Sequence, residues 1–407
     1  MSKVILGSND EFPVIKKVNT SSLSVTPSTS AQSISAPVGS GFCPVYVSAV
    51  TPSIDKNIKA ENIKKGVAIL GVLGEFEESA GTGLPREVVE GRLQFPESSF
   101  AFELPPTATD VIESGLNRAF NACPSLTSVN LSSLTTVSGA QALNFAFYQC
   151  PITNSIDLSN LVTVSGIYAM DSTFGFCSHI PSVDLSSLTV VSGSWALRNA
   201  FTNCTSLTSI DLSSLTTISG SNGMNGTFNS CTSLTSVDLS NLTTISGSNG
   251  MNGTFKNCKM TSIDLSSLTT ISGSNGMNGT FNSCTSLTSV DLSNLTTISS
   301  SSGMSSTFKN CKMTSMSFPK LSVLSNSYAL RYAFQSCTSL TSVSFPALTS
   351  TSFSSYKNQF NGMLSGVTGC TVHFPSNLQS VIGSWTDVTG GFGGTNTTVL
   401  FDLPATT

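Results

Sequence analysis

Charged residues are scarce in this sequence. Asp, Glu, Lys and Arg together make up 10% of its 407 residues, whereas about 25% is typical of a soluble domain. The 18 basic residues form no cluster, and the formal net charge is -4. A nucleic-acid-binding surface needs a basic stripe that faces the phosphates. We therefore expect no nucleic-acid partner, and a surface whose polar groups are mainly hydroxyls and amides.

Histidine and long apolar runs are also rare. The two histidines, His179 and His373, lie in no recognisable Ser, Cys or metal motif, so we expect no enzyme, no cofactor and no metal site. No segment approaches the ~18 apolar residues that a membrane-spanning helix requires. The N-terminal "MSKVILGSNDEFPVIKK" has too short an apolar run for a signal peptide. We expect folding in a cytoplasm, without membrane insertion.

Repetition is the dominant feature of the sequence. Residues 229–246 and 282–299 share the same sequence, "NSCTSLTSVDLSNLTTIS", and nine cysteines recur every 26 or 27 residues, each with a phenylalanine three residues earlier. This period is typical of solenoids. The two 26-residue intervals result from one-residue deletions after Cys258 and Cys311. The cysteines are Cys123, Cys150, Cys177, Cys204, Cys231, Cys258, Cys284, Cys311 and Cys337.

Each unit contains the pattern of a short strand with one buried face. In the pattern Leu207-x-x-Ile210-x-Leu212, apolar and polar residues alternate. Because one unit cannot bury its apolar side chains alone, units must stack into a continuous core with capped ends. Shifting the repeat frame back by one unit predicts a degenerate first unit, whose core residues are Phe102, Leu104, Leu116 and Phe120. A strand at Cys370-x-Val372-x-Phe374 should close the far end.

The unit sequence resembles a known repeat family. "AFNACPSLTSVNLSSLTTVSG" is similar to the leucine-rich repeat of BspA-like bacterial surface proteins, over about residues 96 to 385. The resemblance implies a solenoid with parallel strands on one side and turns or short helical segments on the other. These units are longer than the usual BspA-type repeat, with the extra residues around "GSNGMNG". The fold is therefore expected to carry over more safely than any ligand preference.

Two ladders of chemically active side chains run along the repeats. Each cysteine is alone in its unit, and zinc sites require ligands at short spacing, so we interpret the thiols as small apolar core residues. The outward positions of successive strands carry carboxylates, which form either a solvated face that discourages aggregation or a cation-binding row. This acidic ladder consists of Asp157, Asp184, Asp211, Asp238, Asp264 and Asp291.

The segment between each strand and the next cysteine varies most among the units. Aromatic and arginine residues, which commonly anchor recognition surfaces, occur there in three units. The candidate ligand-binding residues are Tyr168, Trp195, Arg198, Tyr328, Arg331 and Tyr332. The alternative is that some of these side chains only pack against the next unit.

The N-terminal 80 residues lack the repeat and predict a small β module. "VYVSAVTPSIDKNI" and "NIKKGVAILGVLGEF" resemble a module of tail, fibre and other virion proteins of bacteriophages that infect gut bacteria, over about residues 22 to 76. Leu73 departs from that pattern, which usually has a polar residue there. The resemblance implies an attachment or assembly domain that binds other virion proteins.

These parts predict a repeat solenoid behind a small all-β module, with five regions. The regions are the module (1–80), a linker (81–95), a degenerate cap repeat (96–122), leucine-rich repeats (123–345) and a C-terminal cap (346–407). We expect a non-enzymatic phage virion protein, present in multiple copies or as a homo-oligomer, whose solenoid binds a host-surface glycan or protein. The alternatives are a purely structural virion component, a bacterial BspA-like adhesin, or an envelope-degrading enzyme.

Overall fold

The structure is a computed structural model, which describes the repeat region almost completely. The described residues are 32–34, 45–47, 68–69, 72–73, 87–89, 92–94, 100–104, 108–111, 115–352, 358–382 and 391–405. Before residue 100 these form three antiparallel pairs: β1 (Gln32–Ile34) with β2 (Val45–Val47), β3 (Ala68–Ile69) with β4 (Val72–Leu73), and β5 (Glu87–Val89) with β6 (Arg92–Gln94). The rest of the predicted module and linker lies outside the described residues, so the all-β module stays a prediction.

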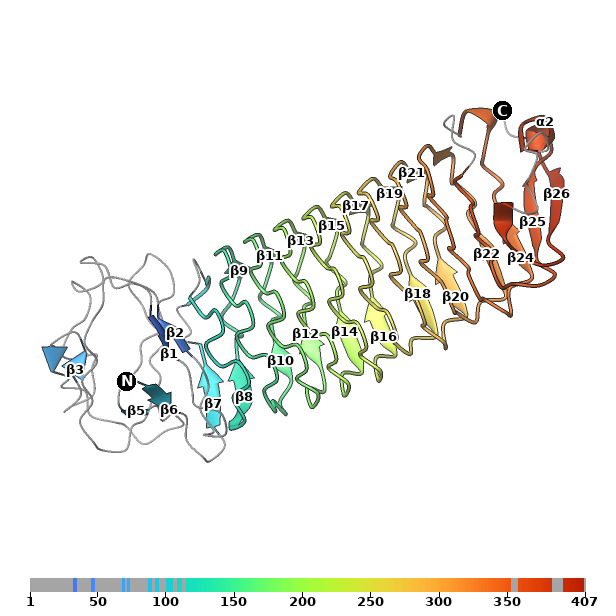
Figure 1. Ribbon diagram of the computed structural model, residues 1–407. Helices are drawn as coiled ribbons and strands as arrows, with labels where there is room; N and C mark the ends of the chain where they lie inside the picture. Colours follow the sequence, from blue (N-terminus) through green and yellow to red (C-terminus); the bar gives the residue numbers. More distant parts are fainter. Residues whose placement is uncertain are drawn as a thin grey trace.

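The repeats form an elongated parallel β-solenoid, which confirms the predicted fold class (Figure 1). Each unit contributes two short strands that pair in register with the same strands of its neighbours. The first-strand series is β8 (Leu126–Asn130), β10 (Ile156–Asp157), β12 (Val183–Asp184), β14 (Ser209–Asp211), β16 (Ser236–Asp238), β18 (Ser262–Asp264), β20 (Ser289–Asp291), β22 (Ser315–Ser317) and β24 (Ser342–Ser344). The second-strand series is β9 (Thr136–Val137), β11 (Thr163–Val164), β13 (Val190–Val191), β15 (Thr217–Ile218), β17 (Thr244–Ile245), β19 (Thr270–Ile271), β21 (Thr297–Ile298) and β23 (Val323–Leu324).

The two strand series differ in continuity. The second strands form one eight-stranded sheet from β9 to β23. The first strands are divided among four sheets, which hold β8, β10–β16, β18–β20 and β22–β24. The two later breaks follow Cys258 and Cys311, where each unit has lost one residue. The first break, between β8 and β10, is bridged by Asn154, whose side chain accepts from Val129 N and donates to Val129 O.

The third side of each unit is a chain of consecutive turns, which we call the turn segment (for example residues 219–231). Backbone N–H groups along the turn segment alternate between two kinds of hydrogen bond, one to the next unit and one within the same turn. Met224 N donates to Gly250 O of the next unit at 2.8 Å, whereas Asn225 N donates to Asn222 O three residues back at 3.2 Å. Every fourth residue has a positive φ, as at Asn222 and Gly226. The family resemblance implied either turns or short helical segments on this side. The described repeats have turns there.

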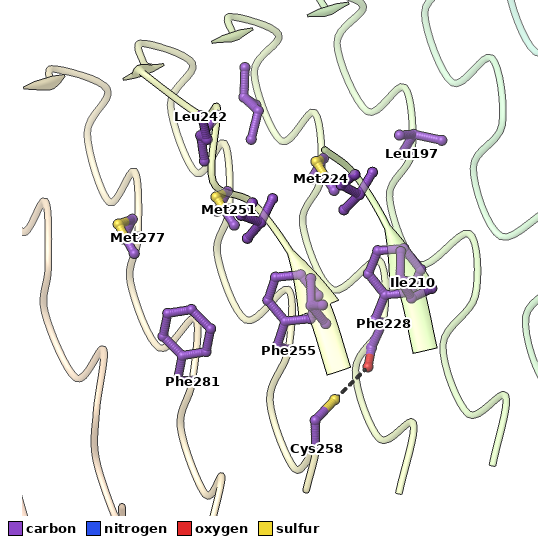
Figure 2. Close-up of a cluster of buried hydrophobic side chains, with 14 of the residues drawn as sticks. Leu197, Ile210, Met224, Phe228, Leu242, Met251, Phe255, Cys258, Met277 and Phe281 are labelled. Carbon is purple, nitrogen blue, oxygen red and sulfur yellow. Dashed lines mark hydrogen bonds between the residues drawn. The ribbon is translucent and has the colours of Figure 1, made fainter. Parts of the chain in front are cut away.

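The core is a stack of identical side chains. The nine phenylalanines that lie three residues before the repeat cysteines, from Phe120 to Phe334, are fully buried. Their neighbouring rings lie 5.2 to 5.8 Å apart at interplanar angles of at most 15°. The thiol of Cys258 donates to Phe228 O of the previous unit at 3.2 Å (Figure 2). Buried threonines make similar bonds, such as Thr254 Oγ1 to Met224 O at 2.7 Å. These bonds satisfy polar groups that stacking would otherwise leave unpaired.

Irregular units cover both ends of the stack. At the start, β7 (Phe100–Glu103) pairs parallel with β8, with Phe102 opposite Val129. The four predicted core residues of this unit are all buried: Phe102, Leu104, Leu116 and Phe120. At the far end β25 (Thr371–Pro375) pairs with β24, and β26 (Thr398–Leu403) pairs with β25. The short helices η2 (Ser350–Ser352), η3 (Ser376–Leu378) and α2 (Gln379–Ile382) lie among these last turns.

Candidate ligand-binding surface

The outward side chains of the turn segments form one long surface, which we call the turn face. Three positions in each regular turn segment have a positive φ, a conformation that asparagine and glycine adopt far more readily than bulky residues. The central units follow this preference, with Asn222, Asn249 and Asn275 at the first position. Tyr168, Trp195 and Tyr328 occupy the same position in other units. The variable residues are therefore aromatic where the backbone disfavours aromatic residues.

Tyr168, Trp195 and Arg198 form one cluster. The Tyr168 and Trp195 rings stack with centroids 5.8 Å apart and an interplanar angle of 5°. The guanidinium carbon of Arg198 lies 4.6 Å from the Trp195 ring centroid and 5.6 Å from that of Tyr168, which is cation–π geometry. The aromatic rings are half-buried, so part of each remains open to solvent.

Arg198 is neutralised within the protein. Its Nε donates to Asp171 Oδ1 at 3.1 Å and its Nη2 donates to Oδ2 of the same carboxylate. Asp171 is 1% exposed and also accepts from the hydroxyl of Ser172 at 3.0 Å. The hydrogen bonds that Arg198 donates to Asp171 raise the pKa of Arg198 above its usual value. A two-pronged pair of this kind fixes the guanidinium in position beside the two rings.

Tyr328, Arg331 and Tyr332 form a second cluster, and four units lie between it and the unit of Trp195. The guanidinium carbon of Arg331 lies 4.9 Å from the Tyr328 ring centroid and 4.7 Å from that of Tyr332. Both tyrosines have a positive φ, 60° and 53°. Tyr332 packs against Gly362, where a Cβ would lie 2.2 Å from the ring. The residues of this cluster are half-buried, so the candidates both pack against neighbouring units and reach solvent.

Sequence reasoning missed four other residues of the turn segments that contact one another. The guanidinium carbon of Arg118 lies 4.8 Å from the Phe145 ring, and Phe145, Tyr148 and Phe176 follow one another at 5.1 and 5.4 Å. Phe176 is 44% exposed. The signal was present, because Phe145 and Phe176 occupy positions where the central units have Gly, Asn or Ser, and Tyr148 occupies one where they have Asn or Lys.

The acidic ladder lies on the first strands, away from the turn face. Asp157, Asp184, Asp211 and Asp238 are in register in one sheet segment, and Asp264 pairs with Asp291 in the next. All six are exposed, and each Oδ1 accepts from the N–H of the serine two residues later at 2.8 to 3.0 Å. Each carboxylate therefore holds its own turn. In the part of the chain that the structure describes, no three His, Cys, Asp or Glu side chains are grouped as metal ligands.

The thiols of the repeat cysteines are buried and stay protonated at neutral pH. Burial raises the pKa of Cys177, Cys231, Cys284 and Cys337 from 9.0 to about 12. A reactive cysteine needs the thiolate, so these side chains act as core residues and hydrogen-bond donors. The histidines lie far apart: His179 contacts Ser178 at 3.2 Å, and His373 contacts Asp402 at 2.9 Å.

Comparison with known proteins identifies the repeat family. The sequence profile described as "BspA type Leucine rich repeat region (6 copies)" matches four overlapping segments between residues 102 and 382, more than half of the chain. The chain belongs to the BspA-type leucine-rich-repeat family. No curated protein matches this BspA-type chain significantly. No helix among its described residues is long and apolar enough to cross a membrane.

Three solved structures of leucine-rich or internalin proteins are similar to this chain. The BspA-type chain resembles a leucine rich cell surface protein from Faecalibacterium prausnitzii A2-165, with 15% identity, a TM-score of 0.33, and coverage of 75% of this chain and 89% of the other. It also resembles a leucine-rich repeat protein from Bacteroides ovatus ATCC 8483, with 17% identity, a TM-score of 0.25, and coverage of 76% of this chain and 94% of the other. A third similar structure is an internalin from Listeria monocytogenes str. 4b F2365, with 12% identity, a TM-score of 0.19, and coverage of 71% of this chain and 86% of the other.

Proposed function

We propose that the solenoid is a non-enzymatic recognition body that adheres to a cell surface through the aromatic and arginine clusters of its turn face. The observation that carries this proposal is the presence of Tyr168, Trp195, Tyr328 and Tyr332 at positive φ. Such a conformation costs a bulky residue about 1 kcal/mol or more. The central units form the same turns with asparagine, serine and glycine, so stacking of units does not require the aromatic rings.

The shape of the solenoid supports adhesion rather than catalysis. The two clusters lie on one open, elongated surface, separated by units with Asn222, Asn249, Asn275 and Ser302 at the first positive-φ position. Two weak contacts on one rigid body bind a surface with repeated ligands more strongly than either contact alone. Repetition would then serve to set the distance between the contacts.

We further propose that the protein is a component of a bacteriophage particle, attached through residues 1–80. The support for this part is the similarity of residues 22 to 76 to virion modules. A bacterial BspA-type adhesin would use the same turn face, and the family match favours it equally. Cryo-electron microscopy of purified particles distinguishes the two: repeats projecting from the particle support the virion role, and absence of the protein from particles overturns it.

Binding to intact bacterial cells tests the recognition role. Fluorescently labelled full-length protein would be titrated onto a fixed number of cells, and the amount bound would be compared with that of the double variant Tyr168→Asn/Trp195→Asn. Asparagine occupies this position in three central units, so the variant should fold. Asn249→Ser, which copies Ser302 at the same position, is the matched control. We expect the double variant to lose most binding and the control to bind normally; equal binding by all three would favour a purely structural role.

A further inference from the structure

The two clusters of the turn face differ in one respect, the charge available to a ligand. Arg198 has a buried carboxylate partner, Asp171, one unit earlier. In the second cluster the residue at the same place is Ser305, which is uncharged. The next residue in that column after Arg331 is Asn361, whose carbonyl accepts from Tyr332 N at 3.1 Å. Arg331 therefore has no carboxylate on either side of it in its own column.

The Nε of Arg331 is buried and has no hydrogen-bond partner among the described residues. An unpaired buried donor is costly, and more so when it carries charge. The guanidinium is held between Tyr328 and Tyr332, which limits its freedom to turn toward water. The rest of the half-buried Arg331 side chain reaches solvent, so an anion there would meet a positioned guanidinium with no carboxylate partner in its own column.

The surrounding turn face is basic. Five cations, Arg118, Arg198, Lys256, Lys309 and Arg331, and one carboxylate, Asp171, lie on the described turn segments. Since Asp171 neutralises Arg198, the half of this face toward the C-terminus carries only positive charge. The exposed carboxylates of the acidic ladder are all on the first strands, so the two faces have opposite sign.

We propose that Tyr328, Arg331 and Tyr332 bind an acidic polysaccharide, with a carboxylate or sulfate on Arg331 and the sugar ring against a tyrosine. This proposal rests on the recognition function and specifies its ligand. Lys256 and Lys309 occupy the same position two units apart, about 10 Å by the spacing of strands. A polymer with regularly spaced anionic groups can contact these lysines and Arg331 along the solenoid axis.

Isothermal titration of the full-length protein tests the ligand class with four probes. They are an oligogalacturonate (carboxylate only), a heparin oligosaccharide (carboxylate and sulfate), a neutral cello-oligosaccharide and a polyglutamate peptide. We expect binding to one or both acidic saccharides, weakening with added salt, and none to the neutral one. Equal binding of polyglutamate would overturn the polysaccharide assignment, because the anion alone would then be recognised. Failure of both acidic saccharides to bind would overturn the proposal outright.

The chain offers its own matched variants. Arg331→Asn copies Asn225 and Asn252 in the same column, and Ser305→Asp gives Arg331 the partner that Arg198 has in Asp171. We expect each change to weaken acidic-saccharide binding about tenfold or more, the effect of losing a charge-assisted pair. Asp171→Asn, which copies Asn144, should strengthen it. Unchanged affinity in both Arg331→Asn and Ser305→Asp would contradict the assignment.

Cell binding by the same variants separates this inference from the function beneath it. Suppose that wild-type protein binds cells, that Tyr168→Asn/Trp195→Asn does not, and that added acidic saccharides do not reduce the binding of wild-type protein to cells. The recognition function then stands, and the ligand class is wrong. If wild-type protein binds no cells at all, the recognition function itself fails.

Discussion

The close approach of glycines in successive units gives the sharpest prediction about stability. A Cβ added to Gly220 would lie 2.1 Å from Gly193 O and 2.7 Å from the carbon of the same carbonyl. Ordinary C···O contacts are about 3.3 Å or longer, so Gly220→Ala must push two units apart by about 1 Å. Because the obstacle is backbone on both sides, no side chain can move to make room.

The cost follows from what that separation breaks. Ser219 N and Gly220 N both donate to Val191 O, at 3.0 and 3.1 Å, and bonds stretched by about 1 Å are lost. Two such bonds contribute about 1–3 kcal/mol, and overpacking adds about 1–3 kcal/mol. We therefore expect Gly220→Ala to lower the free energy of unfolding by about 3 kcal/mol or more. Since each unit contacts only its neighbours, the transition should also broaden.

Guanidinium unfolding followed by circular dichroism measures this effect. Gly253→Ala is the control, because Gly253 has a φ of 60° and open space around its Cβ; it carries only the conformational cost, about 1 kcal/mol. If Gly220→Ala destabilises no more than Gly253→Ala, the argument from close packing of units is wrong. The Cys311 unit has Ser300 at the glycine position, so the prediction applies to the regular units.

Three further predictions concern the ladders. Phe255→Ala should cost about 3–5 kcal/mol in denaturant unfolding, since the ring is fully buried between two others; a loss below 1 kcal/mol would contradict the stacked core. Because burial raises the thiol pKa, the free energy of unfolding should be constant below pH 9 and fall as pH rises toward 12, by at most about 1.4 kcal/mol per thiol per pH unit. Cys231→Ala removes one such thiol, so its free energy of unfolding, measured by circular dichroism, should fall less steeply with pH. A pH profile identical to that of the wild type would refute this. Asp238→Ser should cost under about 1 kcal/mol, because Ser317 occupies the same position; a larger loss, or calcium-dependent melting in a thermal scan, would indicate a cation row.

Much of the solenoid could be predicted because its information is periodic. The Phe and Cys spacing fixed the frame, and the alternation around Ile210 located the first strand, which the structure places at Ser209–Asp211. The acidic residues face outward in register, but their role in holding turns was missed, although Asp-x-Ser recurs in every unit that carries one.

The turn segments could not be predicted in the same way. Their backbone has a positive φ at every fourth residue, and Tyr, Trp and Phe at these positions contradict local preference. The geometry is imposed by hydrogen bonds to the next unit, which sequence reasoning about one unit does not include. The pairing of Asp171 with Arg198 was missed for the same reason, because it joins residues 27 positions apart.

The breaks in the first-strand sheet indicate which block of units was duplicated in the solenoid. Cys231 and Cys284 are 53 residues apart, as are Cys258 and Cys311, so the two later sheet breaks are separated by one pair of units. The block that was copied is therefore a long unit followed by a short one. Gain or loss of such a block changes the reach of the protein by about 10 Å while preserving the alternation of breaks. Length then changes in whole units, without any change to the rest of the fold.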